Sequence, residues 1–119
     1  MTATTANRIA STMGLLAVIL GAFGAHGLRQ VLAHNGTVLI WEKAVFYHFI
    51  HSVILFVLAG RKDFPAAAWW SLLAGITFFS GSLYLLAVTD ARWLGMITPL
   101  GGLCFIVGWV WLGWCPARK

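Results

Sequence analysis

Residues 9–28 read IASTMGLLAVILGAFGAHGL, and this stretch carries no formal charge when its histidine is neutral. At about 1.5 Å of rise per residue, a helix of this length spans about 30 Å, the thickness of the hydrocarbon core of a bilayer. Its last part, Gly21-Ala22-Phe23-Gly24-Ala25-His26-Gly27, spaces glycines three residues apart around one histidine. Glycine is poor in a water-exposed helix but lets helices approach closely in lipid. The stretch therefore predicts a membrane-spanning helix.

The composition of the whole chain indicates the same solvent. Hydrophobic residues make up 61% and charged residues 9% of the 119 residues, against about 45–50% and about 25% in soluble domains. A chain this short cannot bury that excess in a core, so its surface must be apolar. The net charge of +5 comes from residues spread in ones and twos between apolar runs. This pattern fits charges that flank membrane helices, and it disfavours a nucleic-acid-binding stripe.

Turn signals divide the chain into four spans of one membrane domain. Asn35-Gly36 is a helix stop, because both residues tolerate left-handed backbone, and Thr37 can cap the next helix. Pro65 fits the first turn of a third helix, and Thr98-Pro99 fits the start of a fourth. The expected spans are residues 9–28, 40–60, 65–88 and 98–115, with residues 1–8 as a short tail. We therefore expect an all-α, four-helix transmembrane bundle with both termini on the same side.

The distribution of charge predicts the orientation of this bundle. With four spans, five positive residues fall on the side of the termini and three on the opposite side. The five are Arg8, Arg61, Lys62, Arg118 and Lys119, and the three are Arg29, Lys43 and Arg92. The positive-inside rule then favours cytoplasmic termini. A cleaved signal peptide is the alternative for the first span, with Arg8 as its charged start.

Small residues at helical spacing mark the expected helix contacts. They form one face on the first, third and fourth spans. These residues are Gly14, Gly21 and Gly24, then Gly75 and Ser82, then Gly101 and Gly108. Such faces allow close backbone contact where lipid supplies no hydrophobic driving force. We expect helix packing from them; a break around residues 24–27 that exposes carbonyls to a ligand is the alternative.

A group of polar side chains forms the candidate site. One face of the second span carries Trp41, Ala44, His48, His51 and Leu55. Tyr47 lies about 40° around the helix from His51. We expect His26 at the same depth as Tyr47 and His51, because the short loop makes the first two helices antiparallel neighbours. A cluster of these side chains, joined by hydrogen bonds, would avoid unpaired polar groups in lipid.

Glu42 points nearly opposite to His51 around the second helix, so the carboxylate and the histidines are not one catalytic group on that helix alone. Its expected partner is Arg29 or Arg92, from loops on the same side of the membrane. Its neighbour Lys43 is a weaker candidate, because adjacent residues of a helix diverge.

Three interpretations of the polar cluster stay open. The first is a structural latch that fixes helix register. The second is a metal or haem site, since imidazole is a common ligand, His48 and His51 are spaced i, i+3, and His26 could add a third nitrogen. The third is a path for protons or a small solute that uses histidine as a relay.

Several motifs occur together along the chain. In order they are residues 21–28 (GAFGAHGL), Trp41-Glu42, Ala44, Tyr47, His51, residues 79–84 (FSGSLY), residues 98–102 (TPLGG) and Gly108-Trp109. With these motifs the chain resembles the membrane-protein family called domain of unknown function 423, which includes transmembrane protein 256 of animals. The resemblance implies a multi-pass protein, in bacteria of the inner (plasma) membrane, and it supplies no catalytic residues.

Hydrolase or transferase chemistry finds little support in the residues. Ser80 and Ser82 have no base on their own helix, and Gly101-Gly102 lacks the lysine and hydroxyl residue of a phosphate-binding loop. We expect a non-enzymatic accessory subunit or assembly factor of a membrane complex, without a cofactor. Its expected partners are the lipid bilayer, other membrane proteins or further copies of itself. The alternatives are a homo-oligomeric channel or transporter for protons or a small solute, and a haem- or metal-binding redox protein.

Overall fold

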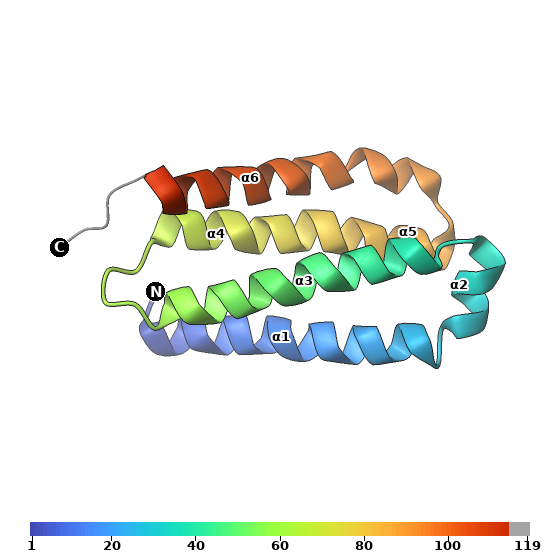
Figure 1. Cartoon of the computed structure of the whole chain (residues 1–119), viewed down its shortest axis with the longest axis horizontal. Helices are drawn as coiled ribbons and strands as arrows, with labels where there is room; N and C mark the ends of the chain where they lie inside the picture. The colour runs from blue at the N-terminus through green and yellow to red at the C-terminus, as the bar shows by residue number, and fades with distance from the viewer. Residues whose placement is uncertain (115–119) are drawn as a thin grey trace.

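The structure, a computed structural model, describes residues 1–114, and within that range it contains helices and no strand. The elements are α1 (Ala3–Ala25), α2 (Arg29–Asn35), α3 (Val38–Ala59), α4 (Ala66–Gly75), the π-helix η1 (Ile76–Ser80), α5 (Gly81–Thr89), the 3-10 helix η2 (Arg92–Met96) and α6 (Thr98–Trp114). α4, η1 and α5 form one continuous rod (Figure 1). Four helical runs are long and apolar enough to cross a membrane. The expected all-α bundle of four transmembrane helices is confirmed.

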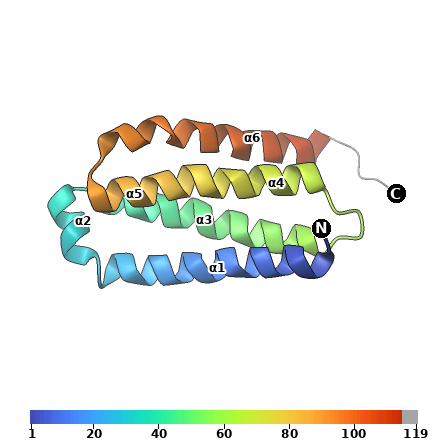
Figure 2. The same cartoon turned by 180° about the vertical axis from the view of Figure 1, so that it is seen from behind.

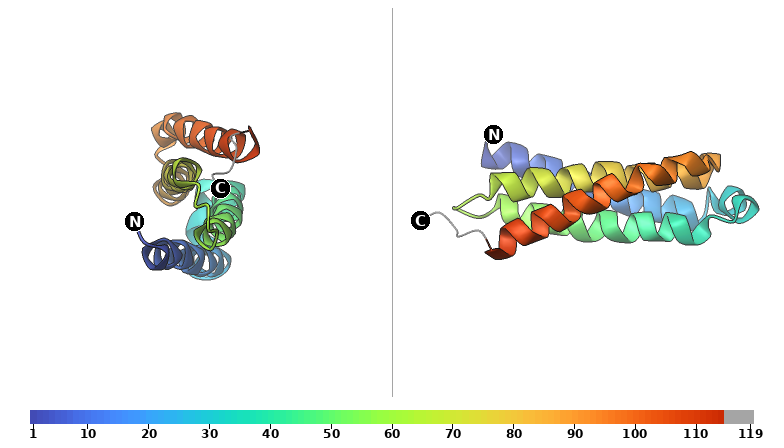
Figure 3. Two further views of the ribbon diagram at one scale, coloured as in Figure 1. Left: turned by 90° about the vertical axis from the view of Figure 1, so that its left-hand side faces the viewer. Right: turned by 90° about the horizontal axis from the view of Figure 1, so that it is seen from above.

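The four long runs form a slab, with α3 and the α4–α5 rod in its middle. α1 packs on α3 and α6 packs on α4 and η1, so α1 and α6 are the outermost helices (Figures 1 and 3). Consecutive runs are antiparallel. The start of α1 and the end of α6 therefore lie at one end of the slab, and α2 lies at the other (Figure 2). The outer faces of α1 and α6 remain free for lipid or for another protein.

The first helix begins and ends earlier than predicted. Thr2 caps α1, because its Oγ1 accepts a hydrogen bond from the Thr5 amide at 3.1 Å. The prediction of a tail over residues 1–8 is therefore wrong, and Ala6 is buried in the helix core. At the other end α1 stops at Ala25 and His26 is its C-cap. The break lies where the alternative interpretation placed it, within the glycine-rich stretch.

The connection between α1 and α3 is a short helix, α2, that crosses the end of the slab (Figure 1). Gly36 ends it with a left-handed backbone, φ +66°, as Asn35-Gly36 predicts. Thr37 precedes α3 but makes no capping hydrogen bond. Its hydroxyl instead donates to the Ala87 carbonyl at 2.7 Å, so it ties this connection to α5.

The α4–α5 rod contains a π-helix, η1, that the sequence does not predict. A π-turn widens the backbone, and here it brings Phe79 against α6. A Cβ at Gly101 would overlap the Phe79 backbone, so only glycine allows this approach. The hydroxyl of Ser80 donates to the Ala44 carbonyl of α3 at 2.8 Å. The π-helix thus contacts both of its neighbours.

Most of the other small residues named from the sequence also lie where helices cross. A Cβ at Gly24, Gly75 or Gly108 would overlap a side chain of the facing helix. Those side chains are Trp41, Phe105 and Leu72, in that order. Gly21 would meet Val45 at 3.3 Å, and Ser82 bonds Thr98 through its hydroxyl at 2.7 Å. At Gly14 a Cβ would be 4.0 Å from Ser52, an ordinary contact.

Candidate functional site

The buried face of α3 is the centre of the site. The five residues that share this face by helical spacing, Trp41, Ala44, His48, His51 and Leu55, are all at most 5% exposed. His48 and His51 are near the middle of the helix, about 15–20 Å from its start at Val38. Both imidazoles are therefore at hydrocarbon depth, where each ring nitrogen needs a partner.

His51 has a partner for both of its ring nitrogens. Nδ1 lies 2.7 Å from the Tyr47 carbonyl, which can only accept, so this nitrogen carries the proton. The Trp109 indole of α6 donates to Nε2 at 3.0 Å. An indole N–H can only donate, so Nε2 is unprotonated. The two contacts specify a neutral ring with its proton on Nδ1.

Aromatic rings surround His51. Its ring stacks on Phe105 with centroids 3.8 Å apart, and Tyr47 and Phe79 lie next to the same pair. A hydrogen-bonded imidazole inside an aromatic cluster gives this helix contact both packing and a fixed register.

His48 contacts a different helix. Its Nδ1 lies 2.8 Å from the Tyr84 hydroxyl of α5. Its Nε2 is buried and is the one buried side-chain polar atom among residues 1–114 that lacks a hydrogen-bond partner.

His26 and Glu42 do not join this cluster. His26 is exposed at the end of α1, where α2 begins. Gly21 and Gly24 already face Val45 and Trp41, so antiparallel pairing places His26 beyond Trp41, toward the start of α3. The expected common depth of His26 with Tyr47 and His51 is therefore wrong, because α3 begins only after α2 has crossed the slab.

The ion pair expected for Glu42 is also not formed. Within the described part of the chain, the Glu42 carboxylate makes no salt bridge. Arg92 instead pairs with Asp90 at 2.7 Å and donates to the Asn35 carbonyl at 3.1 Å. Arg29 and Glu42 line the same groove, described below.

The sequence did not indicate the tryptophans that link the helices. Trp41 donates to the Leu20 carbonyl at 2.9 Å, joining α3 to α1. Trp69 donates to the Leu55 carbonyl at 3.1 Å, joining α4 to α3. The Trp69 side chain is fully buried. Trp109 and Tyr84 belong to motifs quoted from the sequence, but the sequence did not indicate that they bond His51 and His48, because these histidines are far away along the chain.

The three histidines considered as metal ligands, His26, His48 and His51, do not lie together. Within residues 1–114, no three His, Cys, Asp or Glu side chains lie close enough to share an ion. His48 is directed to α5 and His51 to α6, while His26 is outside the bundle. The polar latch interpretation agrees best with these contacts.

Over residues 1–114, the grooves on the surface of the slab include two of similar size. The first, of about 790 Å³, lies between α3 and α6. Tyr47, His51 and Phe105 line it, together with one face of α6 that carries Gly102, Ile106, Trp109 and Gly113. The second groove, of about 770 Å³, lies where α1, α2 and α3 meet.

This arrangement can be compared with known proteins. A family model described as "Protein of unknown function (DUF423)" matches residues 20–102. The chain belongs to the DUF423 family. The match covers the last turns of α1, then α2, α3, the whole α4–α5 rod and the start of α6.

Relatives of this DUF423 chain include membrane proteins of Staphylococcus and Bacillus. A UPF0382 membrane protein of Staphylococcus haemolyticus is 47% identical over 102 residues, which cover 82% of this chain and 83% of the relative. A UPF0382 membrane protein of Bacillus subtilis is 47% identical, with 81% of this chain and 82% of the relative covered. Another, from Staphylococcus epidermidis, is 48% identical over 81% of each chain. No solved structure matches the chain.

Proposed function

We propose that this DUF423 protein is a non-enzymatic accessory subunit or assembly factor, and that it holds a transmembrane helix of a larger complex in the α3–α6 groove. It acts in the inner (plasma) membrane of a bacterium, with its termini in the cytoplasm. The side of the termini follows from the excess of Arg and Lys on that side.

The observation that carries the proposal is the position of Tyr47. Its side chain lines the α3–α6 groove and is 37% exposed. Within the described residues its hydroxyl makes no hydrogen bond. Tyr47 is about 14 Å from the start of α3, too deep for the hydroxyl to reach interfacial water. An unpaired hydroxyl in hydrocarbon is costly, so a partner helix with an acceptor would stabilise the groove.

Apart from His48, whose Nε2 is unpaired, the other polar side chains that join helices support a structural role. Serine, threonine and tryptophan side chains bond backbone or side chains of neighbouring helices. These bonds include Ser71 to Cys104, Ser80 to Ala44, Ser82 to Thr98, Thr37 to Ala87, Trp41 to Leu20 and Trp69 to Leu55. His51 likewise has no free nitrogen with which to take or give a proton.

The test is a purification in mild detergent from native membranes. Gly102 lines the groove and Gly81 lies on α5, and a Cβ at either position meets nothing within 4 Å. Gly102→Leu should fill the groove and lose an identified membrane-protein partner that Gly81→Leu retains. Purification of the wild-type protein alone at native abundance would overturn the proposal. Recovery of only further copies of the chain would favour the homo-oligomeric channel instead.

A further inference from the structure

The second groove combines an apolar wall with two opposite charges. Its wall includes Gly21 and Gly24 of α1 and Val45 and Phe49 of α3. Arg29, the first residue of α2, and Glu42 of α3 lie at its rim. Neither charged side chain forms an ion pair or a side-chain hydrogen bond within residues 1–114.

The depth of these residues gives the groove an amphiphilic profile. Glu42 is about 6 Å from the start of α3, close to the membrane interface. Ile50, at the far end of the wall, is about 18 Å from the same point, near the middle of the bilayer. The charged end therefore lies at headgroup level and the apolar wall follows the direction of an acyl chain.

The pair of charges selects among lipid headgroups. A phosphate would interact with Arg29, since guanidinium binds phosphate through charge-assisted hydrogen bonds. Glu42 would repel a headgroup that carries only negative charge, but it accepts hydrogen bonds from a primary ammonium. A quaternary ammonium has no N–H to donate, so choline fits this carboxylate less well. A second copy of the chain would bring the same two charges and no acyl chain.

We propose that the α1–α2–α3 groove binds a phospholipid with a phosphoethanolamine headgroup, its phosphate at Arg29, its ammonium at Glu42 and one acyl chain along the apolar wall. This site is separate from the α3–α6 groove, so either proposal can fail alone.

The test is native mass spectrometry of the full-length protein, delipidated in detergent and titrated with phospholipids of identical acyl chains. The headgroups are phosphoethanolamine, its N-monomethyl and N,N-dimethyl forms, phosphocholine and phosphoglycerol. We expect apparent affinity to fall along the methyl series and to be about tenfold lower for phosphocholine, the effect of one lost charge-assisted hydrogen bond. Equal affinity for all headgroups in the wild-type protein overturns the proposal.

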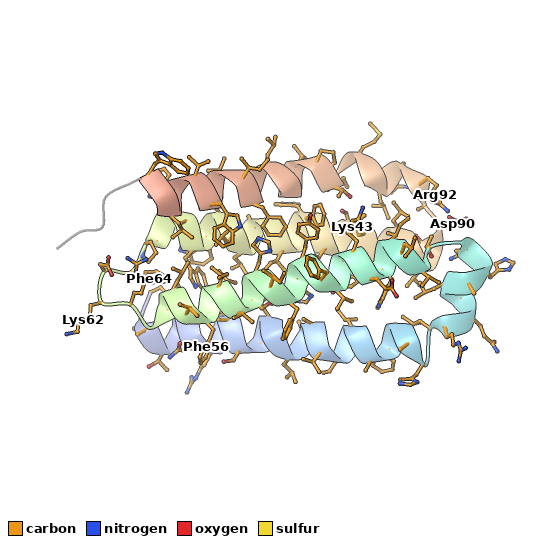
Figure 4. All side chains as sticks on the ribbon, in the orientation of Figure 1. Lys43, Phe56, Lys62, Phe64, Asp90 and Arg92 are labelled. Carbon is orange, nitrogen blue, oxygen red and sulfur yellow. The ribbon has the colours of Figure 1, made fainter. Side chains whose placement is uncertain are left out.

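Variants localise the binding. Glu42→Gln should abolish the preference for ethanolamine over choline, and Arg29→Gln should weaken binding of both. Lys43→Gln is the matched control for Arg29→Gln. It also removes one positive charge, next to Glu42 in the sequence, but from a side chain directed away from α1 (Figure 4). A headgroup preference that survives Glu42→Gln overturns the assignment, and so does a loss of lipid affinity in Lys43→Gln as large as that in Arg29→Gln. So does a protein dimer that excludes the lipid.

Discussion

The hydrogen bond from Trp109 to His51 is the contact whose loss has the clearest expected effect. Trp109→Phe keeps an aromatic ring on α6 but removes the indole N–H, which is the side-chain donor to His51. His51 is 5% exposed, so its Nε2 is then left without a donor at hydrocarbon depth. Because Trp109 is itself 44% exposed, the smaller ring loses little packing inside the bundle.

The size of the effect follows from this geometry. An unpaired buried acceptor costs about 1–3 kcal/mol. Side-chain hydrogen bonds between transmembrane helices average about 0.6 kcal/mol and reach about 1.7. The ring of Phe105, stacked on His51 with centroids 3.8 Å apart, has no hydrogen-bond donor to replace the lost indole. We therefore expect Trp109→Phe to lower the free energy of unfolding by about 1–2 kcal/mol.

The assay is reversible unfolding in mixed micelles with increasing dodecyl sulfate, followed by circular dichroism. Trp111→Phe is the control, because Trp111 is on the same helix, is 46% exposed, and its indole makes no hydrogen bond among the described residues. A loss for Trp109→Phe no larger than that for Trp111→Phe would refute the reasoning. Nitrogen NMR gives a second readout, since wild-type His51 should carry its proton on Nδ1.

Two further predictions use the same unfolding assay. Gly101→Ala should lower the free energy of unfolding by about 1–3 kcal/mol, because the new Cβ overlaps the Phe79 backbone, whereas Gly113→Ala, in open space, should be neutral or stabilising. Hydrogen bonds from Arg61, 2.7 and 3.1 Å long, lower the pKa of the partly exposed Asp63 carboxyl. The resulting small stabilisation is present above the unfolded pKa of about 3.9 and is lost as the pH falls through the folded value. The wild-type midpoint should therefore fall slightly more on acidification than that of Asp63→Asn, and equal declines would contradict the ion pair.

Local chemistry made the turns predictable. Gly36 ends α2 because a glycine after asparagine accepts the left-handed conformation at no steric cost. α6 begins at Thr98 with Pro99 in its first turn, where a missing N–H is harmless. The break at His26 and the π-helix at Ile76–Ser80 were harder to place, since an apolar run in lipid reads as helix regardless of its exact hydrogen-bond register.

The candidate site was only partly predictable. Helical spacing correctly placed His48 and His51 on one buried face of α3, because periodicity is a property of that helix alone. The partners Tyr84 and Trp109 are on other helices, and their distance along the chain carries no information about contact. His26 was misplaced in depth because α2 shifts the pairing of α1 with α3.

The sequence by itself determined that this chain forms membrane helices, since uniform apolar composition and flanking charge are properties of each segment. It also determined the small residues that let helices approach. Only the tertiary structure decided which group each polar atom bonds, and that Arg29 and Glu42 share a groove while neither joins the histidines. The physical reason is that lipid tails are as apolar as the helix faces. Without hydrophobic contrast to choose partners, helix pairing follows from close packing and from hydrogen bonds that form only once the helices meet.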